Sequence, residues 1–143
     1  MIAVDANLLI YAHDPTSGDH PRARAWFNAI LSDEPAVGLP LVSILAFMRI
    51  GSDPRLARLQ KTIAEITSTV SSWIDRGNVI ILEPTPRHWP IFFSLLAETH
   101  STGHRVTDAH LAALAIEHGA TLYTNDRDFR RFPKLDVRFP LAE

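Results

Sequence analysis

Short apolar segments alternate with longer segments of helical periodicity along this chain of 143 residues. The apolar segments, which we expect to be strands, lie at residues 1–5, 36–40, 78–84, 121–126 and 137–140. The segments with apolar residues at helical spacing lie at 8–12, 20–31, 41–53, 55–77, 86–103 and 105–120. Strands that alternate with helices favour an α/β fold with a central, mostly parallel sheet. In such sheets, ligands bind outside the carboxyl ends of the strands.

Glycine and proline mark several of the expected helix ends. Gly51 and Pro54 are expected to end the helix that begins near Leu41, and Gly77 the helix that follows. Thr107 is a suitable cap for the segment 105–120.

Length and composition narrow the class of protein. A chain of this length with 46% hydrophobic residues can close one core, so we expect a single domain over residues 1–143. The absence of cysteine excludes disulfides, thiolate zinc sites and cysteine nucleophiles. No apolar run approaches the ~20 residues that span a bilayer, and the N-terminus has no signal-peptide pattern. We therefore expect a cytoplasmic protein without a membrane partner.

Asp5 stands where a buried strand should end, and it needs an explanation. An unpaired carboxylate costs several kcal/mol to bury. Asp126 and Asp128 follow directly on another apolar segment. If both strands belong to one parallel sheet, their carboxyl ends lie at the same edge. The three carboxylates are therefore expected to come close together.

Asp108 is a fourth carboxylate in an unusual position. It lies in the first turn of an apolar helix and shares a face with Leu111, Ala112, Ala115 and Ile116, so it should point toward the sheet. Carboxylates that converge repel one another unless a cation neutralises them. All-oxygen ligands suit Mg²⁺ or Mn²⁺, and such an ion can activate water for phosphodiester hydrolysis.

Each carboxylate also has an ordinary structural interpretation. Asp5 could cap the helix that follows it, and Asp108 could favour the positive end of its helix dipole. Asp126 and Asp128 could pair with the arginines at 127, 130 and 131. His104 and His110 flank Asp108, but His110 falls on another face of the helix, and we do not expect either to be a metal ligand.

At these residues the chain resembles the PIN-domain ribonucleases, in particular the VapC-type toxins of toxin–antitoxin pairs. The segments that carry the resemblance are "VDANLLIYA" at 4–12, "RARAWF" at 22–27, "LAFMRI" at 45–50, "TDAHLAALAIEHGATLYTNDRDFRRFP" at 107–133 and the tail "VRFP". The resemblance implies a three-layer α/β/α fold. It also implies Mg²⁺- or Mn²⁺-dependent endoribonuclease activity on structured RNA such as transfer or ribosomal RNA, a cognate antitoxin that occupies the active-site groove, and a homodimer.

The resemblance assigns roles to individual residues. Asp5, Asp108 and Asp126 would be the catalytic acids and metal ligands, with Asp128 nearby as a further ligand. Asn7 and Thr124 match polar positions that hold the acids in place. Asn7 lies two residues after Asp5, and Thr124 lies two residues before Asp126.

The chain departs from the family pattern at one position. Many relatives carry a glutamate in the helix after the second strand, where this chain has Ala46. This makes one metal ion a better expectation than two. Arg49 on the same helix, and Arg127 after Asp126, are our candidates for contacts with the RNA backbone.

Two other functions remain open from the sequence. The loss of the glutamate suits a catalytically weakened module that only binds RNA or an antitoxin. A metal-dependent DNA nuclease of the same architecture is also compatible, because no aromatic RNA-binding motif is present.

Overall fold

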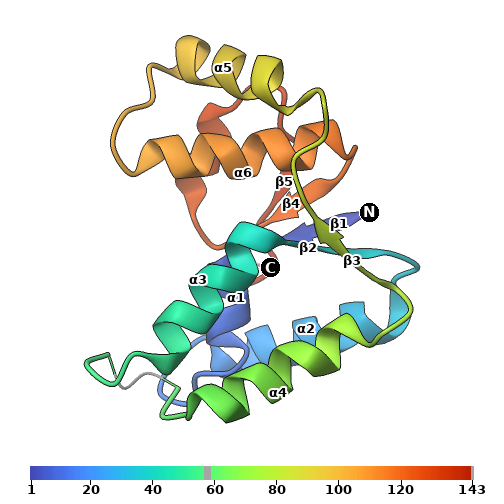
Figure 1. Cartoon of the computed structure of the whole chain (residues 1–143), viewed down its shortest axis with the longest axis vertical. Helices are drawn as coiled ribbons and strands as arrows, with labels where there is room; N and C mark the ends of the chain where they lie inside the picture. Colours follow the sequence, from blue (N-terminus) through green and yellow to red (C-terminus); the bar gives the residue numbers. More distant parts are fainter. Residues whose placement is uncertain (57–58, 143) are drawn as a thin grey trace.

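The computed structural model describes residues 1–56 and 59–142, and its centre is a five-stranded parallel sheet. The strands are β1 (Ile2–Val4), β2 (Val37–Pro40), β3 (Val79–Leu82), β4 (Thr121–Tyr123) and β5 (Val137–Arg138), in the spatial order β3-β2-β1-β4-β5. Helices cover both faces, so the fold is a three-layer α/β/α sandwich, as expected (Figure 1).

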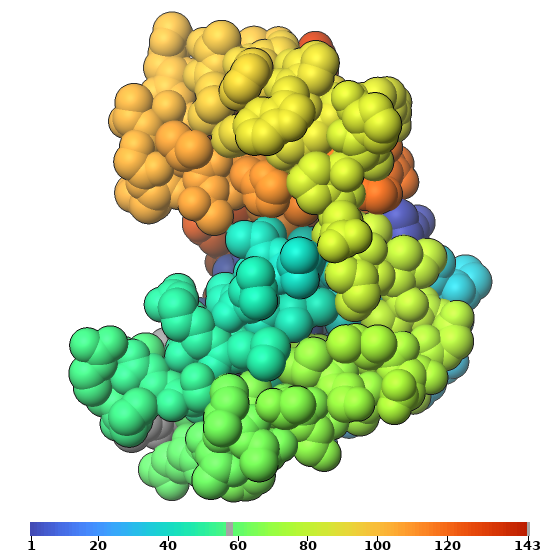
Figure 2. Space-filling model, in the orientation of Figure 1, coloured from blue at the N-terminus to red at the C-terminus, as the bar shows by residue number. Residues whose placement is uncertain are grey.

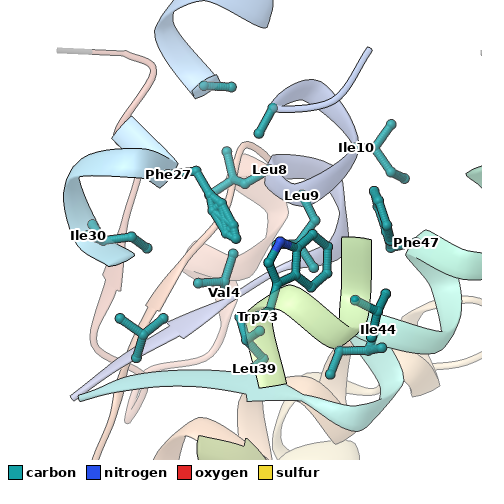
Figure 3. Packing of buried hydrophobic residues seen from close by; sticks show 14 of the residues in the cluster. Val4, Leu8, Leu9, Ile10, Phe27, Ile30, Leu39, Ile44, Phe47 and Trp73 are labelled. Carbon is teal, nitrogen blue, oxygen red and sulfur yellow. The ribbon is translucent and has the colours of Figure 1, made fainter. Parts of the chain in front are cut away.

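Four helices lie on one face of the sheet. They are α1 (Ala6–Tyr11), α2 (His20–Asp33), α3 (Leu41–Ser52) and α4 (Ile63–Ile74). Their core includes Val4 and Leu39 from the strands and Phe27, Phe47 and Trp73 from the helices, and Figure 3 shows how closely these side chains pack. Burying one such side chain is worth about 1.5–3 kcal/mol.

The other face carries α5 (His88–Thr99), α6 (Arg105–Glu117) and the short 3₁₀ helix η1 (Arg127–Arg131). Ala3 and Leu122 turn toward this face, because neighbouring residues of a strand point to opposite sides of the sheet. Helix α6 has a long run of buried small residues, which lets it lie close against the sheet. Figure 2 shows the molecular surface receding between α6 and α3.

The helix expected over 55–77 is the clearest difference from the sequence prediction. Helix α4 begins only at Ile63, and residues 57–58 lie outside the described part of the chain. Thr62 caps it: its hydroxyl accepts from the Glu65 N–H at 3.2 Å, and the Glu65 carboxylate accepts from the Thr62 N–H. Before it, Asp53 accepts a hydrogen bond from the Arg55 N–H and begins a turn.

The expected cap of α6 is also wrong. The helix begins at Arg105 with His104 at its N-cap, so Thr107 lies inside the first turn. Helix α3 ends at Ser52, one residue beyond Gly51, and α5 is shorter at both ends than expected. In the described part of the chain, no helix is both long enough and apolar enough to cross a membrane.

Candidate active site at the ends of β1 and β4

The candidate site lies where the strand order reverses. From β1 the chain continues to β2 on one side, while β4 pairs with β1 on the other side. Two neighbouring strands whose connections leave in opposite directions open a crevice at their carboxyl ends, which is where α/β proteins bind ligands. Asp5 follows β1 and Thr124 follows β4, so both stand at this crevice.

Asp5 is held in a fixed orientation by two hydrogen bonds. Its Oδ1 accepts from the Ala6 N–H at 2.7 Å, so the side chain caps α1, and its Oδ2 accepts from the Thr124 hydroxyl at 2.7 Å. Burial raises the pKa of the Asp5 carboxyl to about 6, these two bonds oppose the rise, and the charges of Asp108 and Asp126 add to it. Asp5 therefore does cap α1, which the sequence left open as an alternative interpretation. Its carboxylate also experiences the negative charges of Asp108 and Asp126.

Thr124 links the ends of the two strands. Its side chain is fully buried, and besides donating to Asp5 it accepts from the Asn7 amide at 3.3 Å and from the Asp126 N–H at 3.0 Å. Asn7 in turn accepts from the Asn125 N–H at 3.2 Å. These bonds tie the first turn of α1 to the loop after β4.

The two acids after β4 have different surroundings. The Asp126 carboxylate accepts from the Asp128 N–H at 2.9 Å at the start of η1, and its charge raises the pKa of both Asp5 and Asp108. The Asp128 side chain is 58% exposed and lies 3.9 Å from the Arg105 guanidinium. Asp126 thus belongs to the group formed with Asp5 and Asp108, whereas Asp128 stands at its outer side.

Asp108 enters the group from the first turn of α6. Its side chain is 22% exposed, and burial together with the Asp126 charge raises its pKa, although the Arg131 guanidinium opposes the shift. Arg131 lies 3.6 Å from the Asp108 carboxylate, and its Nε and Nη2 are buried without a hydrogen-bond partner in the described part of the chain. A buried guanidinium with unused donors next to an acid is an unusual arrangement, because such donors are costly to leave unpaired.

Arg131 is the site residue that sequence reasoning missed. The sequence indicates it only as one of three arginines that could pair with Asp126 and Asp128. Instead it pairs with Asp108, and its Nη1 donates to the Asp128 carbonyl at 3.2 Å. The sequence does place three arginines within five residues, but only the fold shows which one turns inward.

The two arginines proposed for RNA contact lie outside this group. Arg49 is exposed in the last turn of α3, where its charge assists the Arg55 hydrogen bonds in lowering the pKa of Asp53. The Arg127 guanidinium lies 5.5 Å from the centre of the Phe139 ring. Ala46 is half-buried in α3.

The chemistry of the donors fits a hard divalent cation. The raised pKa values of Asp5 and Asp108 show that their ionised forms would gain from a nearby positive ion, and oxygen ligands suit Mg²⁺ or Mn²⁺. Among the residues described, no three carboxylate or imidazole groups are gathered as a ready-made metal site. This is compatible with Mg²⁺, which keeps several waters and needs only one or two carboxylates.

His110 takes part in a separate network between α5 and α6. Its Nδ1 lies 3.0 Å from Nε2 of the buried His88, whose Nδ1 lies 2.7 Å from the Glu117 carboxylate. The Thr85 N–H donates to the same carboxylate at 2.8 Å. His110 therefore has a partner within the helical layer.

Comparison with known proteins places these features in a family. The PIN domain family matches residues 2–135. Ribonuclease VapC33 of Mycobacterium tuberculosis is 34% identical over 143 residues, which is the full length of both chains. Ribonuclease VapC37 of the same organism is 37% identical over 136 residues, or 92% of each chain.

Solved structures share the fold at lower identity. VapBC2 from Rickettsia felis, bound to a DNA fragment from its promoter, has a TM-score of 0.69 at 16% identity and covers 96% of this chain and 98% of its own. Mycobacterium tuberculosis VapC20, a toxin that cleaves the sarcin-ricin loop, has a TM-score of 0.69 at 16% identity and covers 97% and 100%.

Proposed function

Since the chain belongs to the PIN domain family and is a VapC-type ribonuclease toxin of a toxin–antitoxin system, we propose that it is a Mg²⁺- or Mn²⁺-dependent endoribonuclease. Asp5, Asp108 and Asp126 are its catalytic acids and hold the ion, with Asp128 at the edge of the group. The observation that carries this proposal is that three distant parts of the chain bring their carboxylates close enough for the charges of Asp108 and Asp126 to raise the pKa of Asp5, and for the charge of Asp126 to raise the pKa of Asp108.

The chain's own residues prepare the site in three ways. Thr124 and the Ala6 N–H fix both oxygens of Asp5, so that little reorganisation is needed. Asn7 holds Thr124 and the loop that carries Asp126. When bound, a divalent ion supplies positive charge to the scissile phosphate and lowers the pKa of water.

Arg131 brings hydrogen-bond donors close to Asp108. Its Nε and Nη2 make no hydrogen bond within the described part of the chain, although Nη2 is ion-paired with Asp108 at 3.6 Å. Such a group is suited to a phosphate oxygen, because guanidinium and phosphate pair through charge-assisted hydrogen bonds. Arg49 and Arg127 stay our candidates for contacts further along the RNA, which are salt-dependent and independent of sequence.

The proposal includes partners and substrate. We propose structured RNA, such as transfer or ribosomal RNA, as substrate, supported by the relatives named ribonucleases. The structures of toxin–antitoxin complexes with this fold support a cognate antitoxin. A homodimer is the assembly we expect in solution.

The test compares purified wild-type protein with Asp5→Asn and Asp108→Asn on RNA in Mg²⁺. Cleavage should fall at least ~10³-fold in both variants, and EDTA should abolish wild-type cleavage, because loss of a charged group that acts on the transition state costs about 4 kcal/mol or more. Asp33→Asn, an exposed acid at the end of α2, is the matched control.

Three results would contradict the proposal. Cleavage by Asp5→Asn at the wild-type rate would remove the acids from the mechanism. Specific RNA binding without any EDTA-sensitive cleavage would instead favour the weakened binding module, and preferential cleavage of DNA would favour the DNA nuclease.

A further inference from the structure

A second concave site lies on the sheet face that carries α1–α4, away from the carboxylates. It is a cavity of about 440 Å³ between α2 and α4, closed at one side by the end of α1. Its floor is aromatic: Phe27 and Trp73 are buried and their ring centres are 5.5 Å apart, with the His13 ring 5.4 Å from Trp73. Figure 3 shows Phe27 and Trp73 approaching from α2 and α4.

The walls of this pocket are basic. Arg24 from α2, Lys61 before α4 and Arg76 after α4 line it together with His13, and none of the described lining residues is acidic. Within the described part of the chain, no carboxylate forms an ion pair with any of these three cations. The chain as a whole has a net charge of −2, so the positive charge around this pocket is opposite in sign to the net charge of the chain.

The titration of His13 is consistent with a positive field in the pocket. Burial is the main cause that lowers its pKa, and the charges of Arg24, Lys61 and His20 lower it further. The hydrogen bond between its Nδ1 and the Leu9 carbonyl, 2.8 Å long, opposes the shift. An anion placed here would meet several donors and no repelling carboxylate.

We propose that this pocket binds backbone phosphates of the RNA. Phosphate oxygens only accept hydrogen bonds, and guanidinium and ammonium groups only donate them, so the two are complementary. The cations lie at both ends of α4, a helix about 18 Å long. Cations spaced in this way suit a strand with one charge per nucleotide better than a single small anion.

Helix α1 relates this pocket to the carboxylates. Asp5 caps the beginning of α1 and His13 follows its end, eight residues or about 12 Å along the helix axis. One RNA molecule held in the pocket would therefore be tethered to the protein near the acids. The identity of the ligand rests on the proposed function, whereas the pocket itself does not.

Binding is measured separately from cleavage. Anisotropy of a fluorescent single-stranded RNA is followed in EDTA, over a range of salt concentrations, for wild type and for the triple variant R24Q/K61Q/R76Q. The matched control is R55Q/K134Q/R138Q, which removes the same charge at exposed positions elsewhere. Circular dichroism and thermal midpoints show that each variant is folded, and R24K should retain most of the affinity.

The pocket variant should bind RNA at least ~10-fold more weakly, and its slope of log affinity against log salt should fall by about 2, since each lost phosphate contact contributes about 0.7. The control should keep the wild-type slope. Unchanged affinity and slope in the pocket variant would overturn the proposal.

Three further ligands distinguish the source of the anion. Inorganic phosphate, a mononucleotide and an oligoglutamate peptide are titrated while Trp73 fluorescence and the His13 ring signals in NMR spectra are observed. Weak binding of the first two, tighter binding of RNA and no preference for the peptide would support the assignment. Saturation of the pocket by free phosphate at a lower concentration than RNA requires would overturn the assignment. Tighter binding of the peptide than of RNA would overturn it as well. Binding is read in EDTA, where no cleavage is expected, so a failure of cleavage alone counts against the proposed function only.

Discussion

At the scale of the residue, the single side chain of Thr124 connects several parts of the candidate site. One buried hydroxyl donates to Asp5 and accepts from Asn7 and Asp126, and so joins residues that are about 120 positions apart in the chain. The hydroxyl also lowers the pKa of Asp5 against the effect of burial. Its removal should therefore change both the position and the ionisation of the proposed catalytic acid.

We expect Thr124→Val to shift the acid limb of the pH–rate profile to higher pH. Valine has the same shape but cannot donate to Asp5, so the pKa of the Asp5 carboxyl in the ion-free protein should rise above about 6, and protons should compete with the ion for Asp5 up to a higher pH. Cleavage near pH 6.5 should fall at least ~10-fold, with partial recovery at pH 8–9. Thr124→Ser keeps the hydroxyl and should retain the wild-type profile; superimposable profiles for Val and wild type would contradict the role given to this bond.

At the scale of the element, some helix boundaries could be predicted from the sequence and others could not. The sequence does contain T-x-x-E at 62–65, the pattern that caps α4, but the apolar periodicity that continues back to residue 55 obscured it. The start of α6 at Arg105 has no side-chain cap at all. Tertiary packing against the sheet decides such boundaries, and local sequence does not record it.

The pairing of α5 with α6 depends on a buried polar network that the sequence does not reveal. Glu117 and His88 are separated by 29 residues, and their side chains are 0% and 2% exposed. Glu117 belongs to the expected helix, but nothing in its neighbours indicates that it turns inward. Only the packed structure shows that it accepts from both His88 and the Thr85 N–H.

We expect the losses of stability caused by removing the two partners of this network not to be additive. Glu117→Leu leaves the His88 and Thr85 N–H groups without an acceptor, and His88→Phe leaves the Glu117 carboxylate without its imidazole partner. Each change should lower the free energy of unfolding by about 3 kcal/mol. The double variant should lose less than the sum of the two. Urea unfolding of all four proteins checks this, and strictly additive losses would show that the two side chains act independently.

At the scale of the whole molecule, the sequence was sufficient to predict the parallel sheet and the meeting of its strand ends. Residues after the first and fourth strands do lie together, as Asp5, Thr124 and Asp126 show. The strand order, with β4 beside β1, depends on how the helices share the two faces and is not written in any one segment. For the same reason, the pairing of Arg131 with Asp108 could not be predicted.

The stability of the metal-free protein should depend on Asp5. Its pKa is about 6 in the folded state, against 3.8 for an ordinary aspartate, so folded protein keeps this proton to higher pH than unfolded protein does. The resulting stabilisation is complete below pH 3.8 and is lost as pH rises to 6, by up to about 3 kcal/mol. Asp5→Asn should not suffer this loss.

The measurement is urea unfolding in EDTA at pH 4 and pH 7.5. The stability of Asp5→Asn relative to wild type should increase between these pH values, while Asp33→Asn reports the general effect of removing a surface charge. A difference between Asp5→Asn and wild type that is the same at both pH values would show that burial does not penalise the ionised carboxylate.

The position of β4 beside β1 has a consequence for biosynthesis. In a nascent polypeptide, Asp5 is made about 120 residues before Thr124 and Asp126, which come into place only when β4 pairs with β1. A product that stops before β4 therefore lacks half of the site. The ribosome that makes this protein is consequently not exposed to a complete cutting centre until β4 and the loop after it have been translated.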